Sequence, residues 1–146
     1  MAESTGKTGR GVRFKISDGN SPAVFVAVAN VTSINLSGRD AEEIDFTTLD
    51  STGGFREYRQ GFKDGGTIAL EIHFNPEEET AQDLLALWLA GTVVDFQIDY
   101  SGAGWNFAEQ GRGYFQNPGD ITIDISNPIG GQATFRVTGG TQIVGV

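Results

Sequence analysis

Few side chains of this sequence are of the types that perform acid–base or nucleophilic catalysis. His73 is the only histidine and cysteine is absent, so a histidine general base or a serine triad would have to use His73. No G-x-S-x-G nucleophile turn accompanies it. A surface or interface histidine explains His73 better than a catalytic one. The sequence therefore predicts no catalytic residue and no enzyme.

Metal and cofactor sites are also weakly supported. Asp18–Asn20 and Asp120–Asp124 contain oxygen ligands of the kind that calcium prefers, but neither follows the EF-hand spacing. Turn and strand-face roles are favoured for both. A glycosidase would need two opposed carboxylates in a cleft, which sequence spacing cannot show. No glycine pattern lies between a strand and a helix as a phosphate cradle requires. We predict no metal and no cofactor.

The segment from Asp50 to Gly66 has an unusual composition for a connection. It combines five glycines with three aromatic and three basic residues, namely Phe55, Arg56, Tyr58, Arg59, Phe62 and Lys63. The aromatic side chains would either pack back on their own domain or form a docking surface, because aromatics and arginines are typical of interface hot spots. Composition alone leaves these two interpretations equal. In either case, glycine pairs at the two ends are expected to act as hinges, at Gly53, Gly54, Gly65 and Gly66.

Alternating apolar and polar residues indicate the strands that position this segment. Val12–Ser17, Thr67–Phe74 and Val94–Tyr100 have the period of two of half-buried strands. Glu43–Thr48 also alternates, so residues 49–66 are predicted to be a long loop between two strands, and long ordered loops are often functional. Further strands are predicted at residues 24–33, 105–116, 121–126 and 133–137, and residues 141–146 are expected to complete the sheet or to dock on a neighbour.

One helix is predicted at Pro76–Ala90. Asn75 is a suitable cap, Glu78 a capping-box partner, and Gly91 a suitable C-terminal residue. With no second helix to contact, its apolar face must lie on a sheet. The expected fold is mainly β, a β-sandwich or flattened barrel of about eight strands with one flanking helix. Residues 1–11 are predicted to form a flexible N-terminal arm and residues 12–146 a single domain.

Composition restricts the function classes. The 146 residues carry a formal charge of -9, with a pI near 4.4, and this charge opposes tight binding of nucleic acid. No apolar signal segment or membrane-spanning run is present, which predicts synthesis in the cytoplasm. Asp95, Asp99, Asp120 and Asp124 are expected on a solvated sheet face, which would become an acidic channel wall if several copies formed a ring.

Several short motifs occur in a distinctive order. A strand ends in Asp45-Phe46-Thr47, and the segments Asp50-Ser-Thr-Gly-Gly-Phe-Arg-Glu-Tyr58 and Gly61-Phe-Lys-Asp-Gly-Gly66 follow. An alternating strand and Asn75-Pro76, which opens an acidic helix, come next. In order and spacing this arrangement resembles the major tail tube proteins of long, non-contractile-tailed bacteriophages. The resemblance covers at least residues 34–91.

The resemblance implies a β-sandwich with a helix at its edge, six copies per ring, and rings stacked into a hollow tube through which DNA leaves the virion. The loop at residues 49–66 would then contact the adjacent ring through Phe55, Arg56, Tyr58, Arg59, Phe62 and Lys63. The N-terminal arm and the C-terminal end would contribute to contacts between subunits or rings. Asp95 and Asp99 are candidates for the acidic lumen wall, along which DNA slides without specific binding.

The same resemblance implies a location in the virion tail. The expected partners are further copies of the chain and the tape measure, tail terminator and tail tip or baseplate proteins, and no membrane binding by this subunit is expected. The nearest alternative is a tube protein of a contractile tail or type VI secretion-like system. A carbohydrate-binding β-sandwich that uses Trp88, Trp105 and Tyr114 is more remote, because Trp88 is expected in the core.

Overall fold

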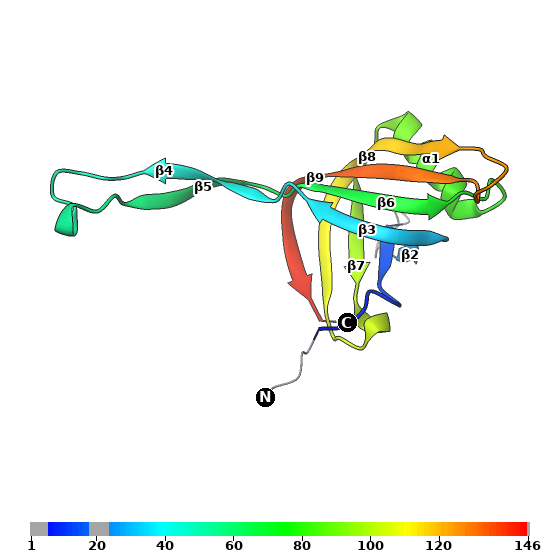
Figure 1. The fold of residues 1–146 in the computed structure, drawn as a ribbon, viewed down its shortest axis with the longest axis horizontal. Helices are drawn as coiled ribbons and strands as arrows, with labels where there is room; N and C mark the ends of the chain where they lie inside the picture. The colour runs from blue at the N-terminus through cyan, green and yellow to red at the C-terminus, as the bar shows by residue number, and fades with distance from the viewer. Residues whose placement is uncertain (1–5, 18–23, 146) are drawn as a thin grey trace.

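The computed structural model describes residues 6–17 and 24–145. This part contains nine strands, one α-helix and two short 3-10 turns (Figure 1). The strands are β1 (Arg13–Ser17), β2 (Phe25–Ala27), β3 (Val31–Ser37), β4 (Asp40–Asp45), β5 (Tyr58–Asp64), β6 (Thr67–His73), β7 (Val94–Asp99), β8 (Ala108–Thr122) and β9 (Gly130–Val144). The helix is α1 (Glu79–Ala90), and the 3-10 turns are Thr52–Gly54 and Ser101–Ala103.

Some sequence-based predictions lie outside the described residues. These are the calcium alternative at Asp18–Asn20 and the first five residues of the predicted N-terminal arm. Within the described ranges, no helix has the length and apolar character needed to cross a membrane.

Seven strands form one antiparallel sheet in the order β2-β1-β7-β8-β9-β6-β3. β8 pairs with β7 through residues 108–113, and its later residues pair with the beginning of β9. The register shifts along β8 mark irregularities of the β-bulge type, which bend strands. The bent sheet folds over, so that β1 and β7 face β6 and the first half of β9 (Figure 1).

The predicted mainly β fold with one flanking helix is confirmed, with two details added. The two layers belong to one folded sheet, and among the described residues its end strands β2 and β3 do not pair, so the sheet does not close into a barrel. The strands number nine in this part of the chain. β9 continues to Val144 and thereby incorporates most of the predicted C-terminal segment into the sheet.

The core lies between the two halves of the folded sheet. The ring of Phe135 on β9 makes edge-to-face contacts with Phe14 on β1 and Phe96 on β7, at centroid distances of 5.6 and 5.2 Å. Such geometry adds to the stabilisation from area burial alone. The predicted alternation of β1, β6 and β7 is confirmed, because their inward positions are buried, namely Phe14, Ile16, Ile68, Leu70, Ile72, Phe96 and Ile98.

The helix begins three residues later than predicted. The backbone N–H of Glu77 donates to Asn75 Oδ1 at 3.1 Å, and that of Glu78 donates to Asn75 O at 3.1 Å. Residues 75–78 therefore form a turn, in which the Asn75 side chain satisfies a donor outside the helix, and Glu78 is the N-cap, with an extended backbone. The helix ends at the predicted place, with Gly91 left-handed at φ 64°. Leu84 is buried, and α1 packs on β8 as expected for a helix that covers a sheet.

The predicted loop at residues 49–66 is wrong in its second half. Tyr58–Asp64 form β5, which pairs with β4 in register from Asp45 and Tyr58 to Asp40 and Asp64. We call this hairpin, residues 40–64, the arm; it projects from the body along the long axis of the molecule (Figure 1). Pairing within the hairpin satisfies backbone groups that have no other strand beside them. The sequence does not indicate this strand clearly, because it contains a glycine and charged residues, which are uncommon in strands, and because its aromatic residues are isolated.

β8 also ends earlier than the sequence pattern predicts. The alternation of Ile121, Ile123 and Ile125 indicates a strand over residues 121–126, but β8 stops at Thr122. The carboxylate of Asp124 accepts hydrogen bonds from the Ser126 backbone N–H at 3.1 Å and from Asn127 Nδ2 at 3.4 Å. This local bonding competes with strand pairing and forms a turn in its place.

Candidate assembly surface

The arm exposes large apolar side chains. Phe55 is 76% exposed and Phe62 is 88% exposed, and Leu49 at the tip is fully exposed. Because the arm stands away from the body (Figure 1), these side chains do not form a cluster on their own domain. Composition leaves two interpretations open, packing of these side chains on their own domain or an exposed docking surface. The structure is compatible only with the exposed arrangement. Their role as contact residues stays a prediction.

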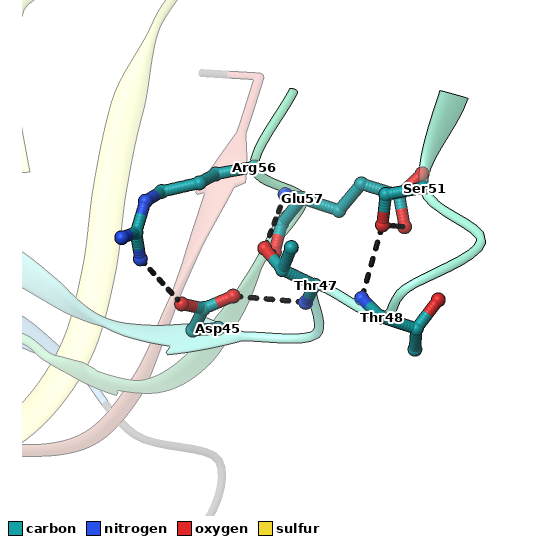
Figure 2. A network of polar contacts seen from close by, with 6 residues as sticks. All are labelled: Asp45, Thr47, Thr48, Ser51, Arg56 and Glu57. Carbon is teal, nitrogen blue, oxygen red and sulfur yellow. Dashed lines mark hydrogen bonds and ion pairs between the residues drawn. The ribbon is translucent and has the colours of Figure 1, made fainter. Parts of the chain in front are cut away.

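Polar contacts within the arm hold its tip in one conformation (Figure 2). Asp45 accepts from the Thr47 backbone N–H at 2.8 Å and from Arg56 Nη1 at 3.3 Å. The Glu57 backbone N–H donates to Thr47 Oγ1 at 2.8 Å, and Ser51 Oγ accepts from the Thr48 backbone N–H at 3.0 Å and donates to Glu57 Oε2 at 3.2 Å. The hydrogen bonds from Thr47, and to a smaller degree from Arg56, lower the pKa of Asp45.

The basic side chains of the arm differ in their surroundings. Arg56 is paired with Asp45, whereas the guanidinium of Arg59 lies over the ring of Phe46, 4.6 Å from its centroid. A cation on an aromatic face keeps its charge available to a further partner. Tyr58 and Lys63 are also exposed. The arm thus presents aromatic and cationic groups together.

One glycine pair lies at the tip of the arm and the other at its base, whereas the sequence predicts hinges at both points where the segment joins the body. Gly53 and Gly54, at φ 68° and 74°, belong to the 3-10 turn at the tip, so the predicted position of this hinge is wrong. Gly65 and Gly66 lie at the base, as predicted, opposite Gly38. Gly66 has φ 83°, and a Cβ atom there would collide with the backbone of Ser37 and Arg39. The close approach of the two chain segments at the base of the arm therefore requires glycine at position 66.

Two ion pairs that the sequence analysis did not predict join the base of the arm to the body. Arg136 Nη2 on β9 lies 2.8 Å from Asp64 Oδ2 at the end of β5. Arg39 Nη2, between β3 and β4, lies 2.6 Å from Oε1 of the buried Glu109 on β8. The backbone N–H of Gly66, and secondly the Arg136 guanidinium, lower the pKa of Asp64. The partners lie about 70 residues apart in sequence, so no local pattern indicates them.

Asp95 and Asp99, the two residues predicted to line the lumen, differ in their exposure and in their partners within the subunit. Asp95 is partly exposed and lies 3.0 Å from Arg112 Nε. Asp99 is only 6% exposed and accepts from Lys15 Nζ at 2.8 Å and from the Ser101 backbone N–H at 2.8 Å. Burial raises the pKa of Asp99, but the bonds from Lys15 and Ser101 outweigh it and lower that pKa to about 2. Asp99 offers no free carboxylate, and its prediction as a solvated wall residue is corrected.

The residues of the alternative functions do not assemble into a reactive centre in the described part of the chain. His73 is exposed at the end of β6, and no group of three or more histidine or acidic side chains is placed to hold a metal there. Trp88 on α1 is 42% exposed, so its expected place in the core is wrong. Trp105 packs on Tyr100 at a centroid distance of 6.3 Å.

Comparisons with known proteins agree with this arrangement. A family model described as phage tail tube, TTP, lambda-like, matches residues 7–126. Among solved structures, the chain is similar to one in the virion of a native gene transfer agent (GTA) particle, with a TM-score of 0.73 and 20% identity over 95% of this chain and 99% of that one. The SPP1 tail tube has a TM-score of 0.68 and 10% identity over 97% and 80% of the two chains. In the PVC extracellular contractile injection system, a chain of the sheath-tube complex has a TM-score of 0.64 and 10% identity over 97% and 93%. At these identities the similarity establishes the fold, and no curated protein sequence matches the chain.

Proposed function

The chain belongs to the lambda-like phage tail tube family, and from this premise we propose that it polymerises as hexameric rings that stack into the tube of a virion tail. It is a structural tail tube protein, and its place is the virion tail. In the proposed assembly, copies repeat head to tail along an axis, which produces an open filament rather than a closed oligomer.

The exposed arm is the observation that carries this proposal. Phe55, Arg56, Tyr58, Arg59, Phe62 and Lys63 lie on a projecting hairpin with little contact to the body, and we assign them to contacts between rings. Exposed apolar side chains that gather on one segment mark an interaction site, whereas single ones are common on any protein surface. Buried between rings, such aromatic and arginine side chains are the types that contribute most to interfaces.

The charge supports a conduit function. From Asp64 to the C-terminus the chain carries eleven acidic residues and only two arginines, Arg112 and Arg136. A wall of like charge lowers the attraction between the lumen and phosphate groups, so DNA slides during ejection into the host without specific binding. Asp95 remains a candidate for this wall.

The wider assembly follows from the same premise. We infer that the tape measure, tail terminator and tail tip or baseplate proteins contact the tube, and that the subunit is synthesised in the host cytoplasm. We also infer a single tail-tube domain at residues 12–146, preceded by a flexible N-terminal arm at residues 1–11.

A second candidate is the tube of a contractile tail or secretion system. Its support is the similarity to the PVC sheath-tube complex and to the anti-feeding prophage baseplate, at TM-scores of 0.64 and 0.65. The two candidates share the subunit fold and differ in the partner around the tube. Co-expression with the remaining tail proteins and imaging of the product distinguishes them, since only a contractile system would yield a tube inside a sheath.

Electron microscopy of the purified, concentrated protein tests the main proposal. We expect hollow tubes of stacked rings with sixfold symmetry in end-on views. Tubes with another rotational symmetry would overturn the hexamer and leave the tube function intact. Protein that stays monomeric over a range of salt and protein concentrations would contradict self-assembly.

A further inference from the structure

Exposed apolar side chains gather at two opposite ends of the molecule. One end is the tip of the arm, residues 46–59, with Phe55 and Tyr58. The other is the connection between β8 and β9, residues 121–129, which we call the isoleucine turn. Figure 1 places the arm and this turn at the two ends of the long axis. Among residues 6–17 and 24–145, the side chains at both ends remain exposed.

The isoleucine turn is apolar without being part of the core. Ile123 is 79% exposed, Ile125 is fully exposed, and Ile121 and Ile129 are also exposed. The Asp124 hydrogen bonds hold the turn, and the Phe74 backbone N–H donates to Ile129 O at 2.7 Å. That bond ties the turn to the segment leading into α1. An exposed apolar patch with such local hydrogen bonds is typical of a protein interface.

Charged side chains accompany the apolar ones at both ends. The segment next to the isoleucine turn contains Glu77, Glu78 and Glu79, and the turn itself contains Asp124. No lysine or arginine occurs between residues 64 and 111 or between 113 and 135. The tip of the arm carries Arg56 and Arg59 together with Asp50 and Glu57. Arg56 is paired with Asp45, whereas Arg59 lies on the face of Phe46, so Arg59 is the tip cation that remains for acidic side chains of a partner. Opposite charges around apolar contacts guide association and set its register.

We propose that the isoleucine turn, together with the nearby Glu77–Glu79, receives the arm tip of the next copy along the tube. This assignment rests on the proposed tube function and adds the receiving surface to it. The occupant is a second copy, because a single chain carries both complementary surfaces at opposite ends. Its own tip cannot reach its own turn, since the ion pairs Arg39–Glu109 and Asp64–Arg136 hold the arm pointing away from the body. A contact of this head-to-tail type repeats without closing.

Disulfide crosslinking tests the pairing, because the chain contains no cysteine of its own. Thr52→Cys combined with Ser126→Cys, at exposed positions beside the proposed contact side chains, should give tubes that oxidation converts into a ladder of covalent multimers on a non-reducing gel. The matched control joins Thr52→Cys to Gln142→Cys, an exposed position near the end of β9 and far along that strand from the turn. It should assemble equally and give no ladder.

A charge exchange provides a second, independent measurement. Arg59→Glu should reduce the amount of sedimentable tube at least tenfold, and adding Glu77→Lys and Glu79→Lys to the same chain should restore most of it. Unmodified protein that forms no tubes would contradict the proposed function itself. Normal tubes without a ladder from the Thr52 and Ser126 pair, a ladder of equal strength from the Gln142 control, or failure of the exchange to restore assembly would each overturn the receiving surface alone.

Discussion

Arg136 on β9 binds Asp64 at the end of the arm, with Nη2 at 2.9 and 2.8 Å from the two carboxylate oxygens. Its Nη1 also donates to Thr67 Oγ1 at 3.3 Å. Next to the other strand of the arm, Arg39, which lies between β3 and β4, makes the corresponding connection to Glu109. Both strands of the hairpin are therefore joined to the body where they leave it, and the direction of the arm is set before any partner binds.

Arg136→Gln should loosen the arm without unfolding the domain. The pair is partly exposed, so the free energy of unfolding should fall by at most about 1 kcal/mol. Amide hydrogen exchange of residues 40–64 should rise, and tube formation should require a higher protein concentration. Asp95→Asn, which breaks the Asp95–Arg112 pair elsewhere on the sheet, is the control and should leave exchange in the arm unchanged. Unaltered exchange in Arg136→Gln would show that the ion pair does not hold the arm.

Acid should destabilise the subunit through Asp99. Its folded pKa of about 2 lies below the usual 3.8, so its stabilising effect is fully present above pH 4 to 5 and is lost as the pH falls through about 2. The shift corresponds to about 2 kcal/mol of unfolding free energy. Chemical denaturation between pH 2 and 6 measures this loss. Asp99→Asn should be less stable at pH 6 and should show a flatter dependence on pH; equal slopes for the two proteins would contradict the assignment.

Gly113→Ala should destabilise the fold. A Cβ atom at Gly113 on β8 would lie 2.8 Å from Cζ of the buried Phe135 and would collide with the backbone oxygen of Arg136. Overpacking of this kind costs about 1–3 kcal/mol, measurable as a lower urea midpoint. Gly140→Ala is the matched control on the neighbouring strand, where the added methyl group meets open space, and should change stability by less than about 0.5 kcal/mol. Similar midpoints for both variants would contradict the close packing.

Phe55→Ala with Tyr58→Ala should separate folding from assembly. Both side chains are exposed on the arm, so the unfolding free energy should change by less than about 0.5 kcal/mol. Tube extension should be lost, as seen by electron microscopy and sedimentation. Val93→Ala shortens an exposed apolar side chain outside the arm and should assemble normally. Tubes of ordinary length from the double variant would remove these residues from the contacts between rings.

Local sequence patterns determine much of the body. The alternation in β1, β6 and β7 correctly predicts which side chains are buried, because every second residue of a half-buried strand faces the core. Gly91 correctly marks the end of α1, since a left-handed residue is needed there. The aromatic and basic composition of residues 50–66 likewise identifies the segment that carries the candidate contact residues.

Tertiary structure decides how these residues are placed relative to one another, which of them pair and which are buried. The sequence does not reveal that Tyr58–Asp64 pair with Asp40–Asp45, nor that Ile123 and Ile125 leave the sheet after Thr122. It gives no sign of Asp64–Arg136, whose partners lie 72 residues apart, or of the burial of Asp99 beside Lys15. Periodicity reports only the surroundings averaged along a strand, whereas these contacts depend on how the sheet folds over and where each strand ends. The projecting arm and the exposed turn at the opposite end are consequences of that fold.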